Sequence, residues 1–295
     1  MIGAQLSGNL VQGLLLGGVY GMATMGLSLI FGVLGVVNVG HGAFMMVGAF
    51  TALLMFTHLG IIPLFSVPIA MVLGMALGLI FFYTVMRRLT DAPELASLLA
   101  TFAIGSLLEE VVKFTIGTEY RGYNWDVGKI SLSFTTLPMA KLYAFGGSIL
   151  IALLLYFWFS KTRAGTAVRA VMQDKEGARV CGINVTWIYA LSFAVGIGLT
   201  VASGVLVTMF VPVGINPYMG HPYTLKAFVI AVLGGLSSPY GAFFAGLIFG
   251  LIENGSYTIF AAVPGLEPFA MTRFLSFVIL LLILLIKPTG LLRAK

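Results

Sequence analysis

The sequence predicts an all-α protein, a bundle of transmembrane helices with about eight or nine spans that forms a single domain over residues 1–295. Of its 295 residues, 59% are hydrophobic and only 9% are charged, and the mean hydropathy is +1.05. Soluble domains usually carry about 25% charged residues, so this much apolar surface indicates a lipid environment. A segment in lipid must satisfy its own backbone hydrogen bonds, as a helix does. The apolar runs are too continuous for the alternating strands of a membrane β-barrel.

A membrane-spanning helix needs about 20 mostly apolar residues, and nine segments approach or exceed that length. In chain order they are 9–35, 41–58, 61–86, 95–116, 141–160, 187–211, 222–236, 240–260 and 271–287. The segments 41–58 and 222–236 are short, so either is a candidate for a broken or re-entrant helix.

The charges of the loops predict the orientation, because Lys and Arg are enriched in cytoplasmic loops. Loop 161–186 carries five basic residues against Asp174 and Glu176, which places it in the cytoplasm. The loop containing Arg87 and Arg88 and the C-terminal residues after 286 are also basic, and the numbers of intervening segments put them on the same side. The basic residues of loop 161–186 are Lys161, Arg163, Arg169, Lys175 and Arg179, and those after residue 286 include Lys287, Arg293 and Lys295. Loop 117–140 is balanced in charge and expected outside, whereas the side of the N-terminus stays open.

No motif is typical of catalysis, nucleotide binding or metal binding. The only Gly-Lys pair, Gly128-Lys129, has Tyr123 where a phosphate-binding loop requires its first glycine. The three histidines lack metal-ligand spacing, and the single cysteine excludes a cysteine cluster. The net charge of +6 follows from the basic loops, without the interleaved aromatic residues that would indicate nucleic-acid binding. We therefore expect neither an enzyme nor a cofactor on this chain.

Glycines recur at a spacing of four residues, which lets helix backbones approach closely in lipid. The pairs are Gly13 and Gly17, Gly17 and Gly21, Gly74 and Gly78, and Gly246 and Gly250. Packing within one bundle is the favoured interpretation, and an interface between subunits is the alternative.

The chain also contains one internal similarity. Val33-Leu34-Gly35, followed by Gly42-Ala43-Phe44, recurs with identical spacing as Val232-Leu233-Gly234, followed by Gly241-Ala242-Phe243. A transporter repeat with broken helices at matching places explains it, and so does chance in a chain rich in Gly, Ala, Val and Leu. Nine spans would make the two copies parallel, whereas a re-entrant segment between them would make them inverted.

The cytoplasmic loop contains a predicted short amphipathic helix. Apolar residues recur on one helical face, at Ala164, Ala167, Val168, Val171 and Met172. Gly182 is a plausible helix stop. Such a helix either lies on the lipid surface or docks into a groove on a cytoplasmic partner.

The loop resembles the coupling loop of the permeases of branched-chain amino-acid ABC importers, the LivH type. Further matching pieces are GLSLIFGVLGVVNVGHG at 26–42, GINPYMG at 214–220, LKAFVIAVLGGLSSPYGAFFAGLIFGLIE at 225–253 and KPTGLL at 287–292. The chain departs from the family at Ala43, where an acid is common, and at Val185 and Trp187, where polar residues are usual. These departures leave the fold as expected and bear on the substrate.

The resemblance implies a multi-pass permease domain in the bacterial cytoplasmic membrane, with its C-terminus in the cytoplasm. The implied partners are two cytoplasmic ABC ATPases that bind ATP and Mg, a second permease chain expected to be a paralogue, and an extracytoplasmic substrate-binding protein. It also implies that the cytoplasmic loop contacts the ATPases. The candidate contact residues are Gly165, Arg169, Glu176, Ala178 and Gly182.

Polar residues within or next to the spans are candidates for the translocation pathway, because polar groups are expensive to bury in a membrane. They are Asn38, His41, Asn216 and Glu253. For Asn38 and His41 a satisfied structural hydrogen bond is the alternative. Lys226 is expected to extend to the membrane interface.

The predicted function is import of branched-chain or other hydrophobic amino acids by alternating access. The same machine importing urea or short amides is the first alternative. An ion-coupled secondary transporter and a passive channel are alternatives of other classes.

Overall fold

All nine predicted segments form helices in the computed structural model, which describes residues 2–90, 92–132 and 135–286. They are α1 (Ile2–Leu34), α2 (His41–Leu59), α3 (Pro63–Thr84), α4 (Glu94–Ile116), α5 (Met139–Lys161), α8 (Val185–Thr208), α9 (Gly220–Gly234), α10 (Pro239–Ala261) and α11 (Pro268–Ile286). Seven helices in the described ranges, α1–α5, α8 and α10, are long and apolar enough to cross a membrane. If α9 and α11 also cross the membrane, the number of spans is nine. The observed helices are thus consistent with the expected eight or nine spans.

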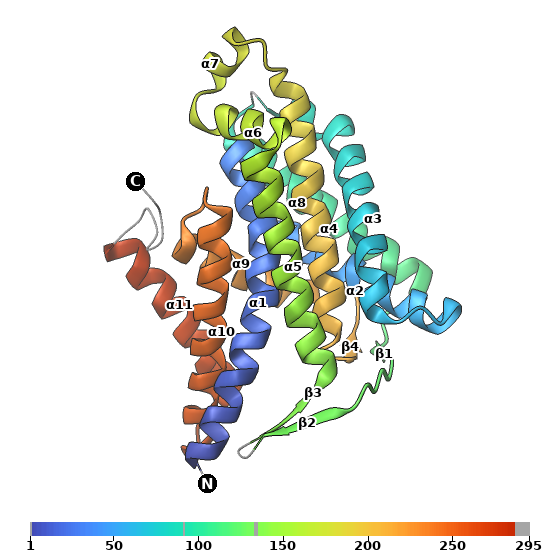
Figure 1. Ribbon diagram of the computed structural model, residues 1–295, viewed down its shortest axis with the longest axis vertical. Helices are drawn as coiled ribbons and strands as arrows, with labels where there is room; N and C mark the ends of the chain where they lie inside the picture. The colour runs from blue at the N-terminus through green and yellow to red at the C-terminus, as the bar shows by residue number, and fades with distance from the viewer. Residues whose placement is uncertain (1, 91, 133–134, 287–295) are drawn as a thin grey trace.

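The connections gather at two ends of the bundle (Figure 1). One end carries α6 (Arg163–Gln173), α7 (Lys175–Val180) and the 3-10 turn η1 (Met86–Arg88), and is called here the α6–α7 end. The other, the hairpin end, carries the N-terminal end of α1 and a hairpin of β2 (Lys129–Leu132) and β3 (Thr135–Pro138). A second antiparallel pair joins β1 (Arg121–Gly122) to β4 (Val213–Ile215). Loops 161–186 and 117–140 therefore lie at opposite ends, as predicted.

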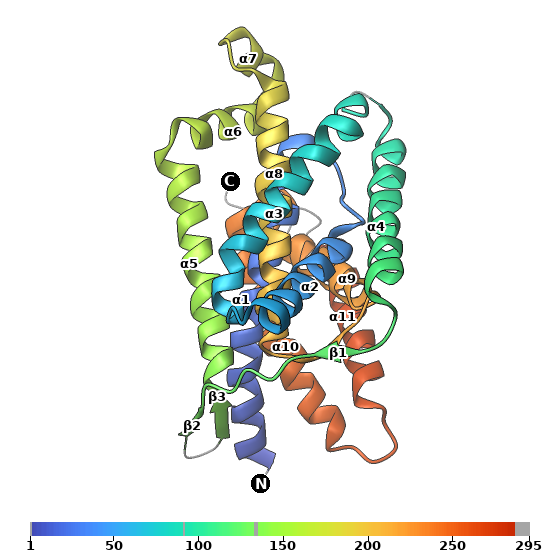
Figure 2. The same ribbon diagram turned by 90° about the vertical axis from the view of Figure 1, so that its right-hand side faces the viewer.

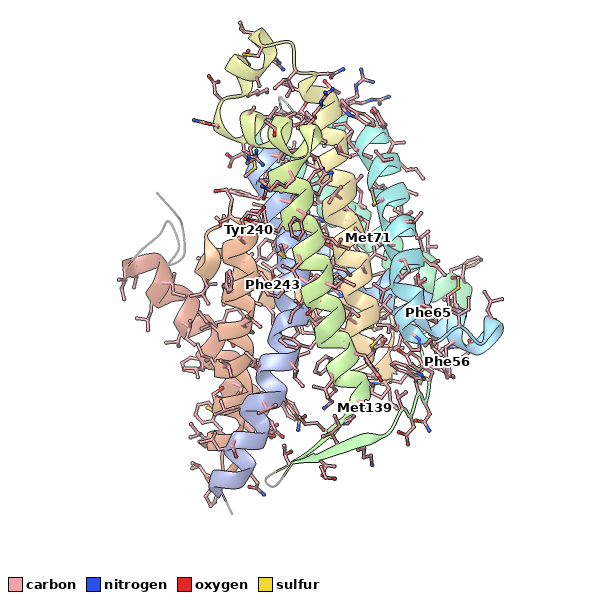
Figure 3. The ribbon with its side chains drawn as sticks, viewed as in Figure 1. Phe56, Phe65, Met71, Met139, Tyr240 and Phe243 are labelled. Atoms are coloured by element: carbon pink, nitrogen blue, oxygen red, sulfur yellow. The ribbon has the colours of Figure 1, made fainter. Side chains whose placement is uncertain are left out.

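The centre of the bundle is formed by α8, which is buried along nearly its whole length between α1, α2 and α3. Aromatic packing also joins the surrounding helices to one another, because Tyr240 at the start of α10 (Figure 3) lies 5.9 Å, ring centre to ring centre, from Phe159 of α5. The outer faces carry exposed apolar side chains such as Phe65 on α3. Exposed apolar side chains on the outside of a helical bundle are the arrangement that lipid requires.

The glycine pairs pack inside the chain, as the favoured interpretation predicts. A Cβ atom at Gly17 of α1 would lie 2.6 Å from the carbonyl oxygen of Gly246 on α10, and Gly13 meets Gly250 in the same antiparallel contact. A Cβ atom at Gly78 of α3 would lie 2.8 Å from the Cα atom of Ala194 on α8. Any side chain at these positions would push the helices apart.

Segment 35–40 is a break between two helices. Gly35 ends α1 with a φ of +70°, and the chain then descends in extended form to the start of α2, partway down the bundle (Figure 2). Thr101 of α4 holds the segment, because its hydroxyl donates to the carbonyl of Val37 and accepts from the amide of Val39, both at 3.2 Å. Segment 41–58, a candidate for a broken or re-entrant helix, is instead one continuous helix, α2, and the break lies before it. Helix α9, with 15 residues, spans about 22 Å, which is shorter than the hydrocarbon core.

The two copies of the internal similarity occupy equivalent junctions. The first joins the end of α1 to α2, and the second joins the end of α9 to α10. In both, the second helix runs toward the hairpin end (Figures 1 and 2). The copies are therefore parallel, as nine spans require.

Candidate coupling surface and translocation site

Helix α6 docks its apolar face on the chain's own bundle. Thr162 caps the helix, its side-chain oxygen accepting a hydrogen bond from the amide of Gly165 at 3.0 Å. Val168 and Val171 are buried, while the opposite face is exposed. The predicted amphipathic helix is confirmed, and its apolar stripe covers protein rather than lipid.

Three of the five predicted contact residues shape this loop. A Cβ atom at Gly165 would lie 2.6 Å from the Cα atom of Phe159, so only glycine allows α6 to start so close to α5. Gly182 follows α7 with a φ of +79°, which glycine adopts readily. Ala178 is buried and anchors α7. These three residues thus shape the loop, and their contact with a partner stays a prediction.

Arg169 and Glu176 are the predicted contact residues whose side chains face solvent. Arg169 donates to the hydroxyl of Thr166 at 3.2 Å, and Glu176 pairs with Arg179 at 2.9 Å. The helices that carry them, α6 and α7, lie at the α6–α7 end (Figure 1). An exposed ion pair of this kind adds little stability, so these charges are free to serve a contact.

A groove beside α7 was missed by the sequence reasoning. Its lining comes from the end of α3, from η1 and from the start of α8, and consists of Tyr83, Arg87, Asn184, Thr186 and Trp187. The side chain of Trp187 is 51% exposed. Exposed tryptophans are enriched at protein interfaces, so Trp187 is the signal that could have indicated this groove. Trp187 is also one of the positions at which the sequence departs from the family.

The apolar face of α6 also reaches the helix that leads into the break. A Cβ atom at Gly32 of α1 would lie 2.6 Å from the terminal methyl carbon of Met172 on α6. Gly32 lies three residues before Gly35, where the extended segment begins. A movement of α6 would therefore reach the start of that segment through the side chain of Met172.

Asn38 and His41 lie at the break and are fully buried. Neither the amide nitrogen nor the amide oxygen of the Asn38 side chain has a hydrogen-bond partner within the described ranges. His41 has one long contact, 3.4 Å from its Nδ1 to the hydroxyl of Thr200 on α8, while its Nε2 is unpartnered there. A satisfied structural hydrogen bond therefore does not account for Asn38.

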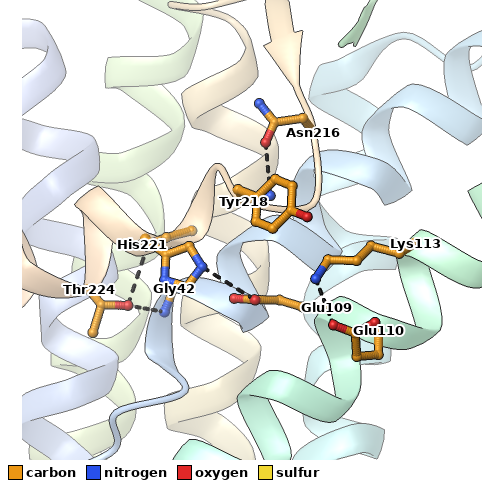
Figure 4. A network of polar contacts seen from close by, with 9 residues as sticks. Gly42, Glu109, Glu110, Lys113, Asn216, Tyr218, His221 and Thr224 are labelled. Carbon is orange, nitrogen blue, oxygen red and sulfur yellow. Dashed lines mark hydrogen bonds and ion pairs between the residues drawn. The ribbon is translucent and has the colours of Figure 1, made fainter. Parts of the chain in front are cut away.

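Asn216 has a local role in the loop after β4. Its Oδ1 accepts from the amide of Tyr218 at 2.8 Å, and its Nδ2 donates to the carbonyl of Gly214 at 3.2 Å. Figure 4 shows this turn beside a polar cluster. In that cluster Glu109 of α4 lies 3.3 Å from Nε2 of His221. In the sequence, Glu109 stands with Glu110 and Lys113 in a small charged group near the end of its predicted span, and its contact with His221 was not foreseen.

Glu253 of α10 lies apart from the break and pairs with Lys226 of α9 at 2.6 Å. The sequence reasoning expected Lys226 to extend to the membrane interface and did not foresee this carboxylate partner. The four candidate pathway residues thus fall in three places, at the break, in the turn after β4 and between α9 and α10. Among the described residues there is no group of three or more metal-ligating side chains.

Comparisons with known proteins agree with this geometry. Residues 9–284 match the family described as "Branched-chain amino acid transport system / permease component". The chain is 29% identical to the high-affinity branched-chain amino acid transport system permease protein BraD of Pseudomonas aeruginosa, covering 96% of this chain and 94% of BraD. It is also 29% identical to LivH of Escherichia coli K12, with the same coverage. Among solved structures, a chain of PsaBC from Streptococcus pneumoniae in complex with Fab has a similar fold, with a TM-score of 0.56, 14% identity, and coverage of 98% of this chain and 97% of that chain.

Proposed function

This chain belongs to the family of permease components of branched-chain amino acid transport systems, and on that premise we propose that it is the membrane-spanning subunit of an ATP-driven importer. The proposed cargo is branched-chain or other hydrophobic amino acids. The observation that carries the proposal is the match over residues 9–284, which takes in the α6–α7 loop and the break at 35–40 together.

The proposed orientation puts the α6–α7 end in the cytoplasm. Basic residues of η1, α6 and α7 gather there, and Arg87 and Asn184 line the same groove. The N-terminal end of α1, at the hairpin end, would then face outward. The basic C-terminal residues Lys287, Arg293 and Lys295, and the KPTGLL motif, lie outside the described residues, so their cytoplasmic side is part of the proposal.

Two ATPases would bind at this cytoplasmic end and supply both the ATP and the Mg sites. Exposed Arg169 and Glu176 would contact them, while Gly165, Ala178 and Gly182 hold α6 and α7 in the required shape. Because α6 is seated on the bundle through Val168 and Val171, a push on it moves the bundle.

Alternating access would act on the break at 35–40. Leaving a buried polar group without a partner costs roughly 1–3 kcal/mol. The unpartnered polar atoms of Asn38 and His41 therefore destabilise the conformation described here. A conformation that exposes them to a solvated pathway relieves that cost. The contact of Met172 with Gly32 is the route by which α6 would drive the change.

The remaining proposed partners are a second permease chain, expected to be a paralogue, and a substrate-binding protein that docks on the hairpin end. The test is reconstitution in vesicles with the ATPases and binding protein encoded by neighbouring genes. We expect uptake of radiolabelled leucine that requires both partners and enclosed ATP and is blocked by vanadate. Uptake that follows an ion gradient and ignores vanadate would instead support a secondary transporter.

Urea and short amides remain the alternative cargo for the same machine. A ligand screen on the purified binding protein separates the two, since that protein delivers the cargo. Binding of urea or acetamide in preference to leucine would contradict the amino-acid proposal and leave the ATP-driven mechanism in place.

A further inference from the structure

A charged network lies within the helices α1, α9 and α10. Nζ of Lys226 is 2.6 Å from Oε1 of Glu253 and donates to the hydroxyl of Tyr20 at 2.9 Å. The ammonium group also lies 4.8 Å from the ring centre of Tyr20 and 5.5 Å from that of Tyr223. The second oxygen of Glu253, Oε2, is buried and has no hydrogen-bond partner in the described part of the chain. The network therefore has an acceptor to spare.

This network forms one wall of a cavity between α9, α10 and α11, of about 750 Å³ including its open mouth. Charged Lys226, Glu253 and Arg273 line it together with the hydroxyl of Ser276. Most of the remaining wall is apolar, from Leu225, Val229, Phe249 and Phe277. Small-molecule sites commonly combine an apolar wall with a few polar groups in this way.

The cavity connects to the outward-facing polar cluster through His221. This residue lines the cavity and also contacts Glu109 of α4 through its Nε2. Its imidazole is stacked on Tyr218, with 6.4 Å between ring centres. His221 therefore joins the wall of the cavity to the polar cluster on α4.

We propose that this cavity binds a free α-amino acid with an aliphatic side chain on its way through the permease. The site deepens the transport function proposed above and rests on it. The ammonium group of the amino acid would contact Glu253, and its carboxylate would contact Arg273 and Lys226. The aliphatic side chain would lie among Leu225, Val229, Phe249 and Phe277.

The cavity presents charges of both signs. Lys226 and Glu253 form an ion pair at 2.6 Å, and Arg273 adds a positive charge that would attract the carboxylate of a ligand. Oε2 of Glu253, which has no partner in the described residues, would accept from the ammonium group of the same ligand. Because the three charged side chains sum to +1, an apolar carboxylate without an ammonium group is the competing ligand, and its comparison with leucine decides between the two.

Thiol labelling tests occupancy of the cavity directly. In right-side-out membrane vesicles that contain the whole transporter, Ser276→Cys is treated with an impermeant thiol reagent. The native Cys181 lies at the opposite end, so wild-type vesicles give the background. We expect L-leucine at ten times its dissociation constant to slow labelling by about tenfold, because the free fraction of a site falls as 1/(1 + [L]/Kd).

The controls separate the ligand's charges and exclude a lipid. Glu267→Cys, in the exposed loop before α11, should react at a rate that leucine leaves unchanged. Leucinamide and isocaproate, which lack the carboxylate and the ammonium group respectively, should protect Ser276→Cys much less than leucine. Absence of labelling, protection that ignores leucine, or protection set only by the phospholipid composition overturns the proposal.

Uptake by charge variants gives the second test. Glu253→Gln should lower leucine uptake by about 10- to 100-fold, the factor expected for one hydrogen bond to a charged group, whereas Glu267→Gln should leave it unchanged. The swap Lys226→Glu with Glu253→Lys keeps the ion pair, so it should restore assembly without restoring uptake. If the swapped variant also transports leucine, Lys226 and Glu253 only stabilise the structure and do not bind the amino acid. If wild-type uptake depends on ATP and on the binding protein but leucine fails to protect Ser276→Cys, this site is wrong and the transport function stands.

Discussion

Asn38 and Asn216 were placed in the pathway by the same reasoning, yet their surroundings differ. Both side-chain polar atoms of Asn216 are used in its own turn. Those of Asn38 are buried without partners within the described residues. Since an unpartnered buried group destabilises the state that contains it, Asn38 has the properties of a residue that acts in another conformation. Asn216 has those of a residue that builds a loop.

This contrast predicts opposite effects for the same substitution. Asn38→Ala should change the free energy of unfolding by less than about 1 kcal/mol, because it removes no hydrogen bond, and should lower leucine uptake at least several-fold. Asn216→Ala should destabilise the protein by about 1–2 kcal/mol through loss of two hydrogen bonds. Thermal unfolding in detergent and vesicle uptake measure the two effects. Wild-type uptake by Asn38→Ala would remove it from the pathway.

At the scale of elements, α6 combines a buried apolar face with an exposed basic one. Val168 and Val171 seat it on the bundle, while Arg169 faces solvent. Its position is therefore set by this chain and its exposed face is left for a partner. The amphipathic pattern alone did not distinguish docking on lipid from docking on protein.

A charge reversal tests that face. Arg169→Glu should reduce co-purification of the ATPase subunits and lower uptake, since a basic contact becomes repulsive. Lys129→Glu, the same change in the exposed strand β2 at the hairpin end, is the matched control and should leave ATPase co-purification unchanged. Normal assembly and normal transport with Arg169→Glu would remove the case for α6 as the coupling helix.

Helices α1 and α10 are held together by contact between their backbones. A Cβ atom at Gly250 would lie 2.6 Å from the Cα atom of Gly17, and backbone atoms cannot move aside as a flexible side chain can. In lipid, close contact of this kind is a main source of attraction between helices. The four-residue spacing of the glycines therefore reflects helix packing within this chain.

Gly250→Ala should consequently destabilise the bundle by about 1–3 kcal/mol, as overpacking does. Gly146→Ala on α5 is the control, because no atom lies within 4 Å of a Cβ placed there. It should be neutral or stabilising by up to about 1 kcal/mol, since alanine is the better helix former. Melting temperatures of the two purified variants measure the difference. Equal melting temperatures would contradict the packing argument.

For the whole molecule, the nine helices alternate in direction, so its two ends face opposite sides of the membrane. The α6–α7 end gathers the basic residues of loop 161–186 and of η1. The N-terminal end of α1 lies at the other end (Figure 1). The chain crosses the membrane nine times, an odd number, if the short helix α9 and the helix α2 that follows the break each cross it once.

Reporter fusions test this arrangement. We expect a reporter at the N-terminus to be accessible from outside and one at the C-terminus to be cytoplasmic, because nine crossings separate them. A reporter inserted after residue 128, in the loop before β2, should be accessible from outside. Two termini on the same side would show that one of the short helices does not cross.

The sequence by itself determined the class of the protein, the nine helical segments and the two ends of the bundle. These follow from local properties, namely apolar length, loop charge and turn residues, which act whatever the rest of the chain does. The apolar face of α6 was also readable from spacing alone, whereas spacing left open whether the two similar segments are parallel or inverted.

Only the tertiary structure decided which polar residues face one another. Lys226 and Glu253 are 27 positions apart in the chain, and Met172 meets Gly32 across 140 positions. No local pattern specifies such pairs, because they depend on which helices become neighbours. Helix neighbours in lipid are chosen by the fit of whole surfaces, and it is that fit which gives Lys226 a buried partner and leaves Asn38 without one.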